Sequence, residues 1–109
     1  MPIKESENDF LSWVIDLAHV RKWAIAHFRP AMVVKNDEIT YRTAVSGDGK
    51  GFPDCVLARG NRLIFAELKS DKGKLSPEQD MWLKLLSESK AEVYVWKPSD
   101  RETIEGILE

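Results

Sequence analysis

The fold is decided by the stretch Phe52-Pro-Asp-Cys-Val-Leu-Ala-Arg-Gly-Asn-Arg-Leu-Ile-Phe-Ala-Glu-Leu-Lys69. Two runs of mostly apolar residues, 55–58 and 62–69, flank Arg-Gly-Asn, which is typical of a tight turn. The pattern predicts two neighbouring strands joined as a hairpin. The turn lies at one end of that hairpin, and the polar residues that flank the strands meet at the other end.

Charged side chains gather at this open end. Asp54 precedes the first strand and Glu67 lies near the end of the second, so both carboxylates can reach one cation. Because side chains alternate along a strand, Lys69 projects to the same side as Glu67. Mg²⁺ prefers a few carboxylates, with water or phosphate oxygens completing its shell, and a nearby ammonium can activate water or stabilise phosphate charge. The three residues therefore form a workable phosphodiesterase site.

Structural interpretations of the same residues are also open. Asp54 can be a turn residue, and Glu67 and Lys69 can be a solvent-facing row of an edge strand. However, Leu63 and Phe65 share their face, which predicts that the row points inward. Inward charges demand partners, because unpaired buried charge is costly. We therefore favour a functional site over a solvated row.

Helix caps and hydrophobic spacing predict the other elements. In chain order we expect a helix over 7–22, a strand over 23–28, a hairpin within 32–45, the two strands above, a helix from the capping box Ser76-Pro-Glu-Gln79, a strand over 91–96 and a helix from a second capping box over 99–102. This order predicts an α/β fold with a mixed central β-sheet flanked by helices. No linker or repeat divides residues 1–109, so we expect a single domain.

The composition excludes several classes of protein. No apolar run approaches the roughly 18 residues that cross a bilayer, so we expect no membrane partner. The first residues are too polar for a secretory signal, and the lone cysteine cannot form an intrachain disulfide. These features favour a cytoplasmic location. Cys55 alternates away from Asp54 and is expected to be a core residue rather than a nucleophile.

The net charge of −2 is unfavourable for binding DNA, because Lys and Arg side chains supply most non-specific affinity. Basic residues nevertheless cluster in sequence around the candidate site. They are Arg29, Arg42, Lys50, Lys69, Lys72 and Lys74. The alternative interpretation is a solvated surface of mixed charge.

The motifs also resemble a known family. Gly51-Phe-Pro-Asp54, twelve intervening residues and Glu67-Leu-Lys69 resemble the PD-(D/E)XK nuclease motif. With Leu75-Ser-Pro-Glu-Gln79, Trp82 and the run 93–100, the chain resembles a stand-alone VRR-NUC domain of the phage or bacterial type. The resemblance covers nearly the whole chain and includes Ser6-Glu7 and His27-Phe-Arg29. The chain departs from the family at residues 31 to about 46, which are longer than the usual connection.

The resemblance implies a restriction-endonuclease-like core and a DNA endonuclease that uses Mg²⁺ or Mn²⁺. Asp54, Glu67 and the main-chain carbonyl of Leu68 match the family's metal ligands. Lys69 matches the catalytic lysine, and Gln79 matches a glutamine that completes the site, although capping alone also explains that residue.

Glu7 matches a metal-binding and catalytic glutamate of the first helix, with Glu5 and Asp9 as alternatives. We expect the nucleic-acid-binding side chains to be His27, Arg29, Lys50, Lys72 and Lys74. His27 has the alternative role of packing at the end of a strand.

The family's stand-alone members resemble Holliday-junction resolvases, which implies a homodimer that cuts branched DNA. Apolar residues that one small core cannot easily accommodate fit such an interface. They are Trp13, Met32, Val33 and Val34; alternatively, they cover the sheet. Two other functions remain open, namely a DNA-binding protein on a nuclease scaffold without robust catalysis, and a metal-dependent hydrolase of another nucleic acid.

Overall fold

The computed structural model describes residues 7–28, 31–42 and 46–109, without the side chains of residues 7, 31–33, 41 and 42. The element order matches the predicted order. The helices are α1 (Glu7–Val20), α2 (Pro77–Ser87) and α3 (Arg101–Leu108), with a 3₁₀ turn η1 (Pro98–Asp100), and the strands are β1 (Ala24–His27), β2 (Ala31–Lys35), β3 (Glu38–Arg42), β4 (Cys55–Arg59), β5 (Arg62–Leu68) and β6 (Glu92–Trp96). None of the described helices is long and apolar enough to cross a bilayer.

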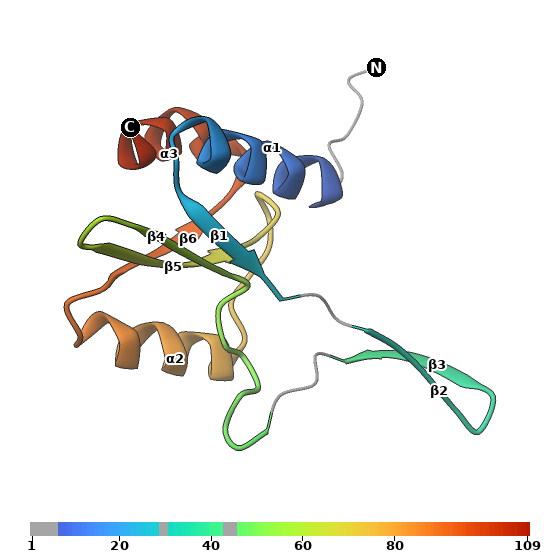
Figure 1. Ribbon diagram of the computed structural model, residues 1–109. Coiled ribbons are helices and arrows are strands. Elements are labelled where there is room, and N and C mark those ends of the chain that lie inside the picture. The colour runs from blue at the N-terminus through green and yellow to red at the C-terminus, as the bar shows by residue number, and fades with distance from the viewer. Residues whose placement is uncertain (1–6, 29–30, 43–45) are drawn as a thin grey trace.

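The main sheet has the strand order β1-β4-β5-β6. β1, β4 and β5 are antiparallel neighbours, whereas β6 pairs with β5 in parallel after the crossover through α2. Figure 1 shows α1 and α3 on one face of this sheet and α2 on the other. The predicted α/β fold with a mixed, helix-flanked sheet is confirmed.

The core lies between the sheet and the α1/α3 layer. Its fully buried side chains include Val14, Ala18, Leu57, Ile64 and Ile104. Trp13, expected to be difficult to place, is half-buried against this core. Its ring stacks on Phe10 with centroids 6.2 Å apart, and the Arg101 guanidinium lies 5.2 Å from its centroid.

The opposite face of the sheet is only partly covered. α2 packs on β6, at the edge of the sheet, and leaves the turn end of β5 open. Leu63 is consequently 40 % exposed, whereas Glu67 on the same strand face is 2 % exposed. The prediction that the whole row points inward is therefore wrong at Leu63 and correct at Glu67.

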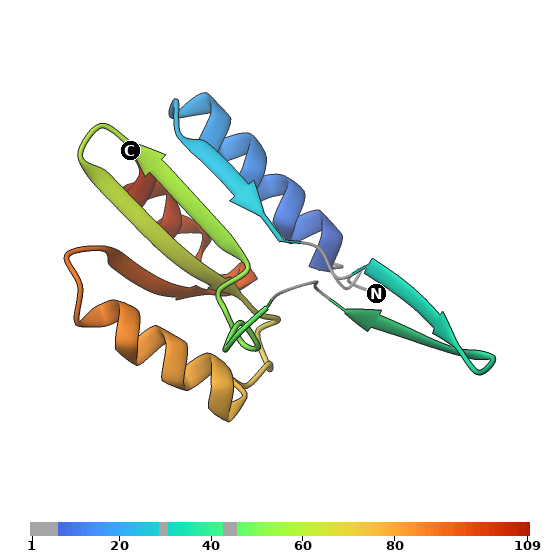
Figure 2. The same cartoon turned by 60° about the horizontal axis from the view of Figure 1, so that its bottom comes forward.

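Residues 31–42 form the expected second hairpin. Asn36 and Asp37 both adopt positive φ, at 53° and 61°, which is the conformation of a two-residue hairpin turn. Figure 2 shows β2 and β3 standing away from the main sheet. Val34 and Ile39, cross-strand partners in this ribbon, are each 62 % exposed.

The two predicted capping boxes have different outcomes. Ser76 and Gln79 cap α2 reciprocally, as expected. Ser99 does not cap α3; the Oδ2 atom of Asp100 instead accepts from the Lys97 amide at 2.9 Å and closes the η1 turn. The Ser99 amide donates to Oδ1 of Asp71 at 3.0 Å, which ties the loop after β5 to η1.

Candidate active site

The β4–β5 register creates the candidate site. Cys55 pairs with Ala66, so the preceding residue, Asp54, lies opposite Glu67 at the open end of the hairpin. The Leu68 amide donates to Oδ2 of Asp54 at 2.9 Å. The backbone of β5 thus orients the Asp54 carboxylate toward the Glu67 side of the sheet.

Among the residues that the structure describes, Glu67 is the one charged residue that is buried. Its Oε1 atom accepts from Nε2 of Gln79 at 2.9 Å and lies 3.6 Å from Nζ of Lys69. Its Oε2 atom is buried with no hydrogen-bond partner among the described residues. A buried carboxylate oxygen without a donor is costly, because it has lost its water and gained nothing in return.

Burial, and next the neighbouring Asp54 carboxylate, raise the pKa of Glu67 to about 8, while Lys69 acts in the opposite direction. Without a cation, the pair therefore retains a proton near neutral pH. A divalent cation between the carboxylates would replace that proton and satisfy Oε2. The donor set, two carboxylates with one unpartnered oxygen, fits Mg²⁺ or Mn²⁺.

Gln79 has two roles at once. Its Oε1 atom accepts from the Ser76 amide at 2.8 Å, which completes the helix cap, and its Nε2 atom holds Glu67. From the sequence, helix capping and a role in the site were alternative interpretations of Gln79. The two ends of the planar amide allow both, so α2 is fixed to the site through its first turn.

The model of the VRR-NUC domain family matches residues 7–100. The chain belongs to this family. It is a nuclease family, so nucleic acid is the partner that membership implies. No curated protein and no solved structure matches the chain.

Two other residues expected in the VRR-NUC site, Glu7 and Arg29, cannot be placed relative to the carboxylates. Glu7 is the first residue of α1, but its side chain is not described, and Arg29 lies outside the described residues. Among those described, no three His, Cys, Asp or Glu side chains form a metal-binding group. Asp54 and Glu67 are thus the two acidic side chains that the structure brings together, and metal binding by them, by Glu7 and by the Leu68 carbonyl stays a prediction.

The expected DNA-contacting residues are spread around the site. His27 pairs with Cys55, next to Asp54, and is half-buried on the opposite sheet face from the carboxylates. Lys50 is exposed, with Nζ 3.5 Å from Oε1 of Glu78. Lys72 and Lys74 are exposed in the loop between β5 and α2.

Cys55 is fully buried, as expected. Burial, with the Asp54 and Glu67 carboxylates adding to it, raises the pKa of its thiol to about 12. The thiol therefore stays protonated and is no nucleophile.

The sequence did not reveal how the loop before β4 is anchored. Phe52 packs edge-on against Phe65 and Trp82, with ring centroids 5.8 and 5.1 Å apart. Trp82, predicted as part of the inner stripe of α2, also donates from Nε1 to the Asp48 carbonyl at 2.9 Å. The available signal was Gly51 itself, because glycine is the usual residue where φ is positive or where two backbone segments approach closely.

Proposed function

We propose that the protein is a Mg²⁺- or Mn²⁺-dependent endodeoxyribonuclease that cuts branched DNA, such as Holliday junctions, as a homodimer. The observation that carries the proposal is the facing pair Asp54 and Glu67, with one carboxylate oxygen buried and unpartnered. Such an arrangement is unfavourable as a structural feature and suits a cation ligand set.

Asp54 and Glu67 would hold the cation, with the Leu68 carbonyl and Glu7 as further ligands. When bound, the ion supplies Lewis acidity toward the phosphate and lowers the pKa of a water molecule. The chain's own contribution is orientation. The Leu68 amide fixes one carboxylate and the Gln79 amide fixes the other.

Lys69 would act on the phosphate or on the attacking water. Its ammonium group lies 3.6 Å from Glu67 and its side chain is 19 % exposed. The group is thus close to the carboxylates yet reachable by substrate. From this position it can donate to a phosphate oxygen or hold the nucleophilic water beside it.

The exposed lysines around the site support a phosphate-binding path. Lys72 and Lys74 follow the Lys69 strand end, and Lys50 lies on the loop that packs on α2. These three cations offset locally the chain's net negative charge. We expect DNA to cross the open end of the hairpin between them.

Two active sites related by two-fold symmetry suit a four-way junction, which needs symmetric nicks in opposing strands. One copy of the described site can cut one strand per encounter. The apolar, exposed pair Val34 and Ile39 on the β2–β3 ribbon offers surface for a second copy. An isolated two-stranded ribbon is only marginally stable in water, which adds to the argument for a partner.

A cleavage panel tests the proposal. The protein is incubated with duplex, flap, splayed and four-way DNA, in Mg²⁺, Mn²⁺, Ca²⁺ or a chelator, and its mass in solution is measured by light scattering. We expect metal-dependent cutting of branched DNA by a species near 25 kDa, twice the chain mass. Preferred cutting of plain duplex or of RNA would overturn the substrate class, and cutting in chelator would overturn the metal dependence.

A further inference from the structure

We propose that Gly51 and Trp82 form a latch, defined by these two residues, that positions Gln79 against Glu67. The inference rests on the proposed nuclease function for its rate measurements. The contacts of these two residues are with the loop and the helix rather than with the carboxylates. Both instead join the loop before β4 to the first two turns of α2, and α2 carries Gln79.

Gly51 makes the closest part of the latch. A Cβ atom at this position would lie 2.6 Å from the carbonyl carbon of Glu78, 2.7 Å from the amide nitrogen of Gln79 and 2.7 Å from the Glu78 Cβ. Two of these atoms belong to the helix backbone and cannot rotate away. Gly51 also adopts φ +85°, which side chains disfavour. The loop therefore approaches α2 as closely as backbone atoms permit.

Trp82 holds the same loop one turn further along α2. Its indole Nε1 donates to the Asp48 carbonyl at 2.9 Å, and its ring meets the Phe52 ring edge-on. Phe52 in turn contacts the rings of Phe28 and Phe65, from the end of β1 and from β5. The aromatic cluster thus ties the loop, the helix and the sheet together around Gly51.

The latch is connected to the site through two residues, Gln79 and Asp54. On one side, the Cα of Gly51 lies so near the Gln79 amide nitrogen that a Cβ atom would come within 2.7 Å of it, and the Gln79 side chain holds Oε1 of Glu67 at 2.9 Å. On the other side, Asp54 follows Gly51 by three residues. Displacing α2 to admit a methyl group would lengthen the Gln79–Glu67 bond, because the cap through Ser76 keeps the Gln79 side chain fixed to the helix. A misplacement of about 1 Å in a catalytic group can cost on the order of a hundredfold in rate.

The chain supplies a matched control for this contact. Gly60, in the β4–β5 turn, has φ +59° and no heavy atom within 4 Å of its ideal Cβ position. Gly51→Ala and Gly60→Ala therefore share the backbone penalty of a positive φ, and only Gly51→Ala adds the collision with α2. Any difference between the two variants reports the contact.

Two measurements compare these variants. In metal-free protein, the side-chain amide signals of Gln79 in a ¹⁵N–¹H spectrum should move in Gly51→Ala and stay in place in Gly60→Ala. On branched DNA, kcat should fall on the order of tenfold to a hundredfold in Gly51→Ala, with KM little changed. Unmoved Gln79 signals in a folded Gly51→Ala variant would overturn the latch. If the wild type cuts no DNA, the proposed nuclease function fails, while the spectrum still decides the latch.

A double-mutant cycle separates positioning from general damage. If Gly51 acts through Gln79, Gly51→Ala should cost little further rate in a Gln79→Ala background. Additive losses in the two variants would contradict this coupling. Should Gly51→Ala not fold, Trp82→Phe is the second variant. It keeps an aromatic ring but removes the indole N–H that bonds to Asp48 and part of the packing on Phe52, and its Gln79 signals should also move. Wild-type signals in Trp82→Phe would then reject the latch.

Discussion

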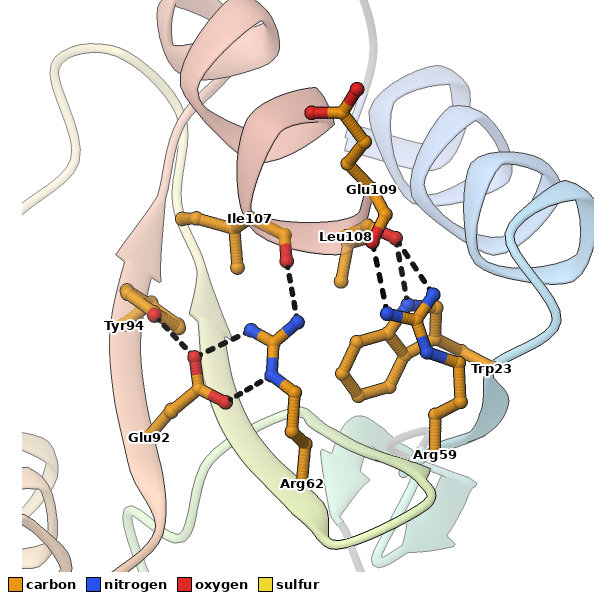
Figure 3. Close-up of polar contacts among 8 residues, drawn as sticks. All are labelled: Trp23, Arg59, Arg62, Glu92, Tyr94, Ile107, Leu108 and Glu109. Atoms are coloured by element: carbon orange, nitrogen blue, oxygen red, sulfur yellow. Dashed lines mark hydrogen bonds and ion pairs between the residues drawn. The ribbon is translucent and has the colours of Figure 1, made fainter.

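At the turn end of the β4–β5 hairpin, Arg59 and Arg62 reach across the α1/α3 face to the last turn of α3 (Figure 3). Arg62 forms a two-point ion pair with Glu92, at 2.8 and 2.7 Å, which holds the pKa of that carboxyl below its usual range. The centres of both guanidinium groups lie within 5 Å of the Trp23 ring centroid, at 4.5 and 4.8 Å. The carbonyl groups that accept from these side chains belong to Arg21, Ile107, Leu108 and Glu109.

The open end of the same hairpin, on the opposite sheet face, is arranged in the contrary way. Asp54 and Glu67 face one another there, and the Lys69 ammonium group lies 3.6 Å from Oε1 of Glu67. Among the described residues, the buried side-chain atoms without a hydrogen-bond partner are Oε2 of Glu67 and Nε1 of Trp96. Trp96 pairs with Leu68 and belongs to the core on the α1/α3 face, so of these two atoms Oε2 of Glu67 is the one at the site.

The two ends of one hairpin thus differ. At the turn end, which we call compensated, the charged groups have partners of opposite charge or hydrogen-bond acceptors; at the open end, which we call uncompensated, a buried carboxylate oxygen has none among the described residues. The compensated end satisfies the carbonyl groups at the end of a helix, which supports the fold. The open end holds two facing carboxyl groups, of which one stays protonated near neutral pH without a cation, and an oxygen that no described donor reaches; a bound cation would replace that proton. The comparison predicts that charge changes at the two ends separate activity from stability.

The largest effect is expected at the open end. Asp54→Asn and Glu67→Gln should each lower the cleavage rate by at least about a thousandfold, because each removes a metal-ligating charge. Neither should destabilise the metal-free fold, since each leaves one ionisable carboxyl group at a place where two cannot both ionise favourably. Cleavage assays, isothermal titration with Mn²⁺ and thermal unfolding measure the three quantities.

Glu105→Gln is the matched control for this experiment, because Glu105 is exposed on α3. It should leave cleavage and Mn²⁺ binding unchanged. Wild-type rates in either open-end variant would refute the assignment of the site.

The next effect concerns Lys69. Lys69→Ala should retain Mn²⁺ affinity within a few-fold and lose rate by on the order of a hundredfold, because the ammonium serves the phosphate or the water rather than the cation. Isothermal titration measures the Mn²⁺ affinity, and single-turnover cleavage measures the rate. Loss of Mn²⁺ binding in this variant would show that Lys69 mainly maintains the carboxylate pair.

The site pair was predictable because its causes are local. Strand alternation and a tight turn place Asp54, Glu67 and Lys69 together, and both signals lie within one continuous stretch of sequence. The cap at Ser76 and Gln79 was equally clear, since its residues are three apart. The second hairpin around Asn36-Asp37 follows the same rule.

What the sequence could not give depends on long-range packing. The position of α2 over β6 leaves Leu63 exposed, and no local pattern specifies where a crossover helix lies. The Gly51 contact and the Trp82–Asp48 bond join segments about thirty residues apart, so the residue types alone did not identify them. The capping-box prediction at Ser99 is wrong, because the Asp100 side chain closes a competing turn by accepting from the Lys97 amide.

A smaller effect, on stability alone, is expected at the turn end. Arg62→Ala should lower the free energy of unfolding by about 2 kcal/mol, because it leaves the Ile107 carbonyl without its donor and Glu92 with the Tyr94 hydroxyl but no cation. The side chain is one-third exposed, so solvent screening limits the loss. Chemical denaturation measures it. Arg62→Lys should lie between, since an ammonium cannot reproduce the two-point pair. A cleavage defect in folded Arg62→Ala would break the separation of the two ends.

The most direct test of an uncompensated open end is the unfolding free energy of the metal-free protein against pH. Glu67 has a folded pKa of about 8, above its ordinary 4.5, so the folded state binds more protons than the unfolded state between these values. Stability must therefore fall, by a few kcal/mol, as the pH rises from about 5 to about 8. Glu67→Gln, which cannot ionise, should lose this decline. Identical pH profiles for the wild type and Glu67→Gln would contradict the account.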